Sequence, residues 1–186
     1  IPVDRVRRSN GYLANTFDNA PAQVQFDVET AAAASGGGNG AVEVVHITTR
    51  GLQYLGEVGN VTSVTNTTTV TITGTSLSAD DCIVNNDIYF TSGDASGEGG
   101  TITDYNGTTK VVTYSPATTA ASSTDGYAIG PKVVISGDGQ GANVRCTVNS
   151  TGGINATAVI AGGNNYSNAS ISILSNASQS NSFNPS

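Results

Sequence analysis

The sequence predicts an all-β protein, built from small antiparallel β-sandwich or β-hairpin modules with an extended N-terminal arm. Short runs of Thr, Val, Ile and Tyr alternate with polar residues, which is typical of strands with one buried face. Gly-rich and Asn-Gly turns separate these runs, and Gly supplies 23 of the 186 residues. The only helix-favouring stretch, Ala31 to Ala34, is too short to form a stable helix and is predicted to be a loop or single turn.

Residues 1 to 23 are the predicted arm. Pro2 and Pro21 disfavour helix, and the apolar residues between them are too sparse to form a core. We expect the arm to lie on a neighbouring domain or subunit, with the cluster of Arg5, Arg7 and Arg8 solvated or docked on a partner. The chain does not begin with Met, as expected of a processed product or of a piece of a longer polypeptide.

The strand signals then follow one another along the chain. An Asn-Gly turn at Asn106-Gly107 predicts a hairpin, with a type I′ turn that places both residues at positive φ. Residues 176 to 186 are rich in Ser and Asn and are predicted to be a tail or linker. Strands are expected at 24–28, 61–64, 69–73, 88–91, 101–105, 110–114, 127–129, 132–135, 143–148, 156–160 and 170–174.

An internal repeat organises these strands into domains. Gly40, Val42, Ile47, Gly51 and Tyr54 match residues of the same kind that lie 112 positions later, at 152, 154, 159, 163 and 166. The repeat predicts two related Gly-rich β-units, at 24–57 and 131–175, that pack together. Residues 58–130 are then an inserted β-hairpin domain.

Composition excludes several classes of function. Only 11% of residues are charged, and 14 acids against 7 bases give a net charge of −7. Nucleic-acid binding requires a cationic face, so we expect none. The first ten residues have no apolar segment typical of a signal peptide, and no run of about 18 apolar residues predicts a membrane span.

The residues that carry chemistry are few. His46 is the only histidine, and its alternating context favours a residue on a strand face over a catalytic one. The Gly-rich stretch 137–142 is followed by a strand pattern, whereas a phosphate loop would need a helix there. We expect no catalytic, cofactor-binding or metal-binding residues and no enzymatic activity. Six acids are candidate calcium ligands, and we interpret them instead as solvated turn residues: Asp80, Asp81, Asp87, Asp94, Glu98 and Asp104.

Two kinds of covalent modification remain open. Cys82 and Cys146 permit one disulfide, although they are also typical of small buried apolar residues. N-glycosylation sequons, to be used only if the protein is secreted, occur at Asn60, Asn66, Asn106, Asn149, Asn155, Asn165, Asn168 and Asn176.

The central segment resembles a β-module of tailed-bacteriophage tail, baseplate and fibre proteins. The matching residues include the runs 88–93, 101–105 and 107–109, with Pro116-Ala117 and 127–129 at the end. An Arg common in the family near position 100 is absent here, and Thr118 stands where the family often has Trp. The Gly-rich segment 133–166 is similar to a module of contractile-tailed phages, including those of cyanobacteria. This resemblance implies a β-rich virion subunit without catalytic residues.

Two functional hypotheses follow. The first is a structural virion protein in an extracellular particle, a homo-oligomer whose partners are copies of itself and neighbouring structural subunits, bound through β-edges and the arm. The alternative is a secreted, N-glycosylated subunit of a surface filament or adhesin. In neither case do we expect nucleic acid, membrane or a cofactor as a partner.

Overall fold

The computed structural model describes residues 24–30, 40–51, 54–74 and 76–174 of the chain. Every regular element in these ranges is a β-strand, so the predicted all-β class and antiparallel hairpins are confirmed. None of the described residues forms a helix long and apolar enough to cross a membrane. The predicted arm at 1–23, the loop at 31–34 and the tail at 176–186 lie outside the described residues.

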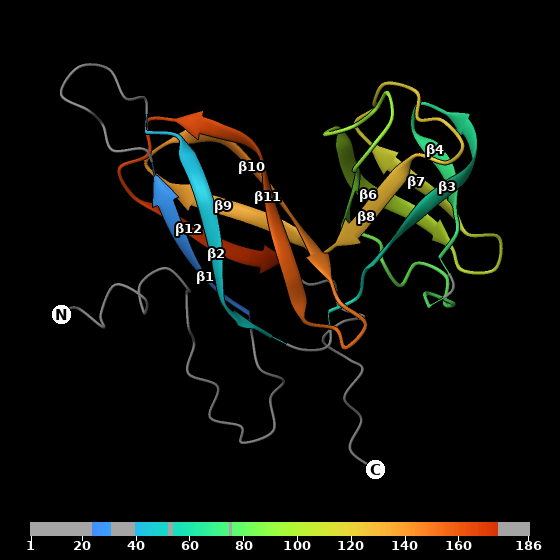
Figure 1. Cartoon of the computed structure of the whole chain (residues 1–186), viewed down its shortest axis with the longest axis horizontal. Helices are drawn as coiled ribbons and strands as arrows, with labels where there is room; N and C mark the ends of the chain where they lie inside the picture. The colour runs from blue at the N-terminus through green and yellow to red at the C-terminus, as the bar shows by residue number, and fades with distance from the viewer. Residues whose placement is uncertain (1–23, 31–39, 52–53, 75, 175–186) are drawn as a thin grey trace, which may run out of the picture.

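Six strands in the middle of the chain form a closed barrel, with the order β3-β4-β7-β6-β5-β8. All six pairings in the ring are antiparallel, and β3 closes the barrel by pairing with β8. The barrel lies on the right in Figure 1. Its strands are β3 (Glu57–Asn66), β4 (Thr69–Ile72), β5 (Asp87–Phe90), β6 (Gly99–Asn106), β7 (Val111–Ser115) and β8 (Gly126–Gly130).

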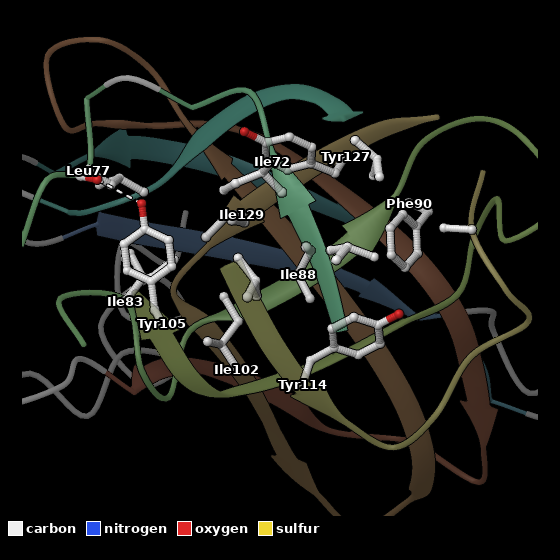
Figure 2. Close-up of a cluster of buried hydrophobic side chains, with 14 of the residues drawn as sticks. Ile72, Leu77, Ile83, Ile88, Phe90, Ile102, Tyr105, Tyr114, Tyr127 and Ile129 are labelled. Atoms are coloured by element: carbon white, nitrogen blue, oxygen red, sulfur yellow. Dashed lines mark hydrogen bonds between the residues drawn. The ribbon is translucent and has the colours of Figure 1, made fainter. Parts of the chain in front are cut away.

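Aromatic and aliphatic side chains pack together inside the barrel (Figure 2). Phe90 packs edge-on against Tyr114, with ring centroids 5.8 Å apart. Tyr105 donates its hydroxyl to the Leu77 carbonyl at 2.7 Å, and burial raises its pKa to about 12. Each of these rings is almost wholly buried, so the barrel interior is a packed core rather than a channel.

The hairpin at Asn106 forms with a different turn from the one predicted. The positive φ lies at Lys110, at 61°, and neither Asn106 nor Gly107 has one. Asn106 Oδ1 instead accepts the N–H groups of Thr108 and Thr109, and the Lys110 N–H donates to the Asn106 carbonyl at 2.8 Å. The prediction of a type I′ turn was therefore wrong, because the Asn side chain organises a longer loop.

The remaining six strands form three antiparallel two-stranded sheets, β1-β2, β9-β12 and β10-β11, which we call the repeat unit. They enclose a second core, which includes Phe26, Val42, Val144 and Ile154. In Figure 1 they lie beside the barrel, on its left. Their bounds are β1 (Val24–Thr30), β2 (Val42–Arg50), β9 (Lys132–Gly137), β10 (Gln140–Val148), β11 (Ile154–Asn164) and β12 (Ala169–Leu174).

The hairpins β1-β2 and β10-β11 have the same register. Phe26 faces Ile47 in the first, and Val144 faces Val159 at the equivalent place in the second. A register shift immediately precedes both Phe26 and Val144, and a second shift follows at the same distance in each hairpin. Two irregularities at matching places are a specific signature, so the hairpins are structural copies of each other.

An approximate twofold axis relates the two copies. The Tyr166 N–H donates to the Gly40 carbonyl at 2.9 Å, and the Tyr54 N–H donates to the Gly152 carbonyl at 2.9 Å. Each copy thus contributes the glycine to one contact and the tyrosine to the other. Gly40 and Gly152 both have positive φ, at 60° and 80°, as the shared turn requires.

The axis passes between β2 and β11, which lie side by side. Val45 and Thr157 occupy equivalent positions there, and the Thr157 hydroxyl donates to the Val45 carbonyl at 2.8 Å. No ladder joins these two strands, so the copies are held together by this hydrogen bond, by the two backbone hydrogen bonds between Gly and Tyr described above, and by packed side chains.

Candidate functional site

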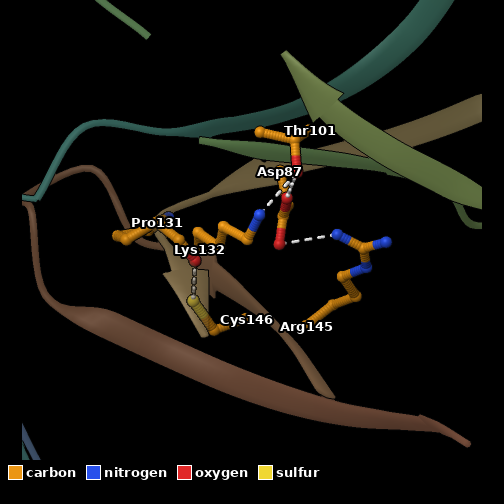
Figure 3. Close-up of polar contacts among 6 residues, drawn as sticks. All are labelled: Asp87, Thr101, Pro131, Lys132, Arg145 and Cys146. Carbon is orange, nitrogen blue, oxygen red and sulfur yellow. Dashed lines mark hydrogen bonds and ion pairs between the residues drawn. The ribbon is translucent and has the colours of Figure 1, made fainter. Parts of the chain in front are cut away.

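A buried ion pair joins the barrel to the repeat unit, and we call its surroundings the joint. Arg145 on β10 approaches Asp87 on β5, with 2.6 Å between Nη1 and Oδ2 (Figure 3). The two side chains are only 10% and 5% exposed. The Thr101 hydroxyl donates to the other oxygen of Asp87 at 2.9 Å, so both carboxylate oxygens are bound.

One polar group in the joint has no hydrogen-bond partner among the described residues. This group is the buried Nε of Arg145. Lys132 extends the network at its edge, since its ammonium group donates to the Thr101 hydroxyl at 3.1 Å. Withdrawing an arginine and an aspartate from water costs several kcal/mol per ion, which their attraction offsets only in this geometry. We therefore expect the pair to fix how the two units meet more than it adds net stability.

Glycines let the two backbones meet at the joint. A Cβ on Gly130 would lie 2.1 Å from the Cys146 carbonyl oxygen, and one on Gly56 would lie 2.3 Å from the Ile129 oxygen. Such distances admit no side chain, so glycine is required at Gly130, where β8 meets β10, and at Gly56, where the chain enters β3 between Ile129 and Val148.

The two cysteines are both free thiols in the structure and belong to different cores. Cys146 donates to the Pro131 carbonyl at 3.2 Å, and burial, with the charge of Asp87, raises its pKa to about 12. Burial also raises the pKa of the half-buried Cys82 thiol. A raised pKa lowers the thiolate fraction, so both thiols are expected to react slowly.

A groove of about 570 Å³ lies next to the joint. Its walls come from the connection between β2 and β3, the start of the barrel, and the β10–β11 turn. Glu57 is the charged residue among those that line it, and its carboxylate accepts the hydroxyls of Ser76 at 2.9 Å and Tyr127 at 2.8 Å. The lining residues are Tyr54, Leu55, Gly56, Glu57, Val58, Ser76, Leu77, Val148, Asn149, Ser150 and Gly152.

The acids considered as calcium ligands serve different local roles. Asp80 accepts the Gly107 N–H at 2.7 Å, and Asp81 accepts the Tyr105 N–H at 3.3 Å. Glu98 binds the backbone and hydroxyl of Thr119, and these hydrogen bonds lower its pKa. Within the described residues, no three His, Cys, Asp or Glu side chains come close enough to hold a metal ion.

Neither His46 nor the Gly-rich stretch 137–142 lies in an arrangement that suggests catalysis or phosphate binding. His46 is exposed on β2 and faces Asp27 across the hairpin. In the stretch 137–142, Asp138 accepts the backbone N–H groups of Ser167 and Asn168 at 2.9 Å each, and the Ser167 hydroxyl. These hydrogen bonds lower the Asp138 pKa to about 2. The stretch leads into β10, and the Asp138 carboxylate binds the turn before that strand to the segment 167–168.

Six of the seven sequon asparagines that the structure describes are exposed. Asn149 is half-buried, because its side chain accepts the N–H groups of Thr151 and Gly153. Asn176 lies outside the described residues. The exposed ones are Asn60, Asn66, Asn106, Asn155, Asn165 and Asn168.

The joint was missed by the sequence reasoning. Asp87 was weighed there only as a calcium ligand, and Arg145 only as part of a strand. The available signal was a charged residue between Val144 and Cys146, in a segment where both neighbours are apolar.

Comparison with known proteins gives no relative. No family description, curated protein or solved structure matches the chain.

Proposed function

We propose that the protein is a structural subunit of a tailed-phage virion, in the tail, baseplate or fibre, and that it has no catalytic role. It assembles with copies of itself and with neighbouring subunits. The resemblance of residues 88–129 to phage β-modules supports this class, and the all-β architecture is compatible with it.

The observation that carries the proposal is the distribution of exposed apolar side chains. Val44, Ile160 and Leu174 are large, exposed, and all on strands of the repeat unit. Val58, at 62% exposure, lies at the start of β3 where the barrel meets that unit. Single exposed apolar residues are common on protein surfaces, so the argument depends on all four lying on or next to the same unit.

Strand edges add to this surface. The closed barrel has no free edge, whereas each strand of the repeat unit pairs with one partner and keeps one edge outside a ladder. A strand edge binds another chain through main-chain hydrogen bonds and needs no charged groups. This mode of assembly suits a chain with 11% charged residues.

The test is self-association of a variant that places charges on the repeat unit. We expect the double substitution Val44→Lys and Ile160→Lys to weaken association at least tenfold in sedimentation velocity. The matched control is Thr103→Lys, which adds a charge to an exposed barrel position and should leave association unchanged. A wild-type chain that stays monomeric at high concentration contradicts self-assembly.

The virion assignment has its own tests. Genes for tail or baseplate proteins should flank the gene for this chain, and a neighbourhood of unrelated metabolic genes would count against it. Deleting residues 1 to 23 should impair assembly more than folding, as measured by particle yield and by thermal unfolding.

The second candidate is an N-glycosylated filament or adhesin subunit. It is favoured by the six exposed sequon asparagines described above. Intact-protein mass spectrometry separates the two proposals. A mass near 18.7 kDa supports the virion subunit, and added hexose units support the secreted filament.

A further inference from the structure

The groove beside the joint has a counterpart across the approximate twofold axis, and the counterpart is filled. The turn that precedes β10 covers Tyr166, so that a Cβ on Gly139 would lie 2.4 Å from the tyrosine ring. Tyr166 is consequently buried. In the same turn Asp138 accepts the N–H groups of Ser167 and Asn168, as described above.

The equivalent residues of the first copy line an open groove. Tyr54, Leu55 and Gly56 correspond to Tyr166, Ser167 and Asn168, and all three line the groove. Tyr54 is only half-buried, whereas Tyr166 is 5% exposed. Among the described residues, the structure shows no acceptor for the Leu55 and Gly56 N–H groups. The described part of the first copy therefore contains no covering turn and no carboxylate like those of the second copy.

The chain position of the missing turn is known from the repeat. The covering turn immediately precedes β10, and the segment that immediately precedes β1 is the end of residues 1–23. Val24 faces Arg50, so this segment enters the fold beside the connection that leads to Tyr54. The register that matches Phe26 with Val144 places Ala20 at the position of Asp138. Asp18, two residues earlier, is the one acid between Arg5 and Val24, and it follows an aromatic residue, Phe17.

We propose that residues 14 to 22 of the same chain occupy this groove. Phe17 fills its apolar part, against Leu77 and Val148. The Asp18 carboxylate accepts the Leu55 and Gly56 N–H groups, as Asp138 does for their counterparts.

The same chain is favoured over a second copy because the segment is covalently attached next to the groove. Attachment through a short link gives an effective concentration in the millimolar range, above that of a separate subunit. Charge is compatible with this placement. The carboxylate of Glu57 is held by Ser76 and Tyr127, and the ammonium group of Lys110 donates to the Leu77 carbonyl at the groove wall. The proposal goes beyond the virion function and does not depend on it, since residues 1 to 13 remain available to a neighbour.

Disulfide trapping in the full chain tests the occupant. In a Cys82→Ala background we pair Phe17→Cys with Ser76→Cys in the groove wall. The control pairs Phe17→Cys with Ser92→Cys, which is exposed near Gly126, at the opposite end of β8 from the groove. We expect the groove pair to cross-link within one chain at least tenfold faster than the control, at a rate independent of protein concentration. Equal rates overturn the proposal. Cross-linked dimers that increase with concentration overturn the same-chain occupant and assign the groove to a second copy.

Amide hydrogen exchange provides a second readout that does not depend on assembly. The Leu55 and Gly56 amides should be protected in the wild-type chain and should exchange at least tenfold faster in Asp18→Ala. Asp4→Ala, the matched control, should leave them protected, and the amide of the buried barrel residue Ile88 should be unchanged in both variants. Unprotected amides in the wild-type chain overturn the proposal. Failure of the self-association test leaves these outcomes unaffected, so the two proposals fail separately.

Discussion

Removing one partner of the Asp87–Arg145 pair should destabilise the protein far more than removing both. Arg145→Met leaves a carboxylate that is 5% exposed, with only the Thr101 hydroxyl bound to it. Asp87→Leu leaves a guanidinium that is 10% exposed and already has one unsatisfied nitrogen. Breaking a buried pair in this way costs about 3–5 kcal/mol, because the remaining charge has neither water nor a partner.

The double variant should recover most of this loss. Replacing both partners by apolar side chains of similar volume removes the desolvation cost together with the attraction, and such replacements range from neutral to stabilising. We expect Asp87→Leu with Arg145→Met to lie within about 1 kcal/mol of wild type. The coupling between the two positions should then be several kcal/mol, beyond the range of about 0.5–3 kcal/mol usual for residues in contact.

Urea unfolding, followed by tyrosine fluorescence and by far-ultraviolet circular dichroism, measures these free energies. The two probes must report the same transition, because a chain with two cores need not unfold in one step. Lys132→Met is the control, since Lys132 is half-exposed and touches the same network only through Thr101. It should cost less than about 1 kcal/mol. Additive losses in the double variant, or a loss below about 1 kcal/mol in Arg145→Met, would refute the reasoning.

Three further predictions concern single residues. Asp138 has a depressed pKa, so it contributes stability above its unfolded pKa of 3.8, and this contribution disappears as the pH falls towards about 2. Asp138→Asn should therefore be less stable than wild type at pH 7. In acid titrations its free energy of unfolding should depend less on pH between those two values. A wild-type slope there would contradict it. Cys82 and Cys146 should both titrate with a thiol reagent after denaturation without reductant, while Cys146 stays unreactive in the native protein at pH 8; fewer than two thiols would reveal a disulfide. Gly40→Ala should lower the thermal midpoint more than Gly97→Ala, since both have positive φ but a Cβ at Gly40 would lie 2.5 Å from a backbone oxygen and one at Gly97 meets no atom within 4 Å. Equal shifts would show that the contact is unimportant.

Alternation along the chain identified most of the strands, because each strand has one face on a core. Residues 101–105 and 110–114 were expected as a hairpin, and β6 and β7 pair there. Closure of the barrel was not predicted. It depends on the pairing of β3 with β8, in which Glu57 faces Ile129, and no local pattern encodes a partner so distant in the sequence.

The joint could not be predicted for a related reason. A buried charge is recognisable only together with its partner, and Asp87 and Arg145 belong to different units. Asp87 follows two asparagines, so its local sequence does not mark it as buried. Arg145 stands out between Val144 and Cys146, but that pattern does not identify its partner. The turn before β7 shows that local sequence also misleads at short range. The Asn-Gly pair favours a two-residue turn, but hydrogen bonds to the Asn106 side chain stabilise a longer loop with its positive φ at Lys110.

The twofold relation also explains where the barrel enters the chain. The two copies remain in step through Glu57, the first residue of β3, which lies 112 positions before Ala169, the first residue of β12. From that point β12 of the second copy pairs with β9. The equivalent strand of the first copy, β3, enters the barrel and pairs with β8. The barrel therefore begins where the repeat would otherwise continue, and β8 returns the chain to β9 across a single residue, Pro131. Because both passages lie beside β10, the joint forms there, and Arg145 on that strand can meet the barrel at Asp87.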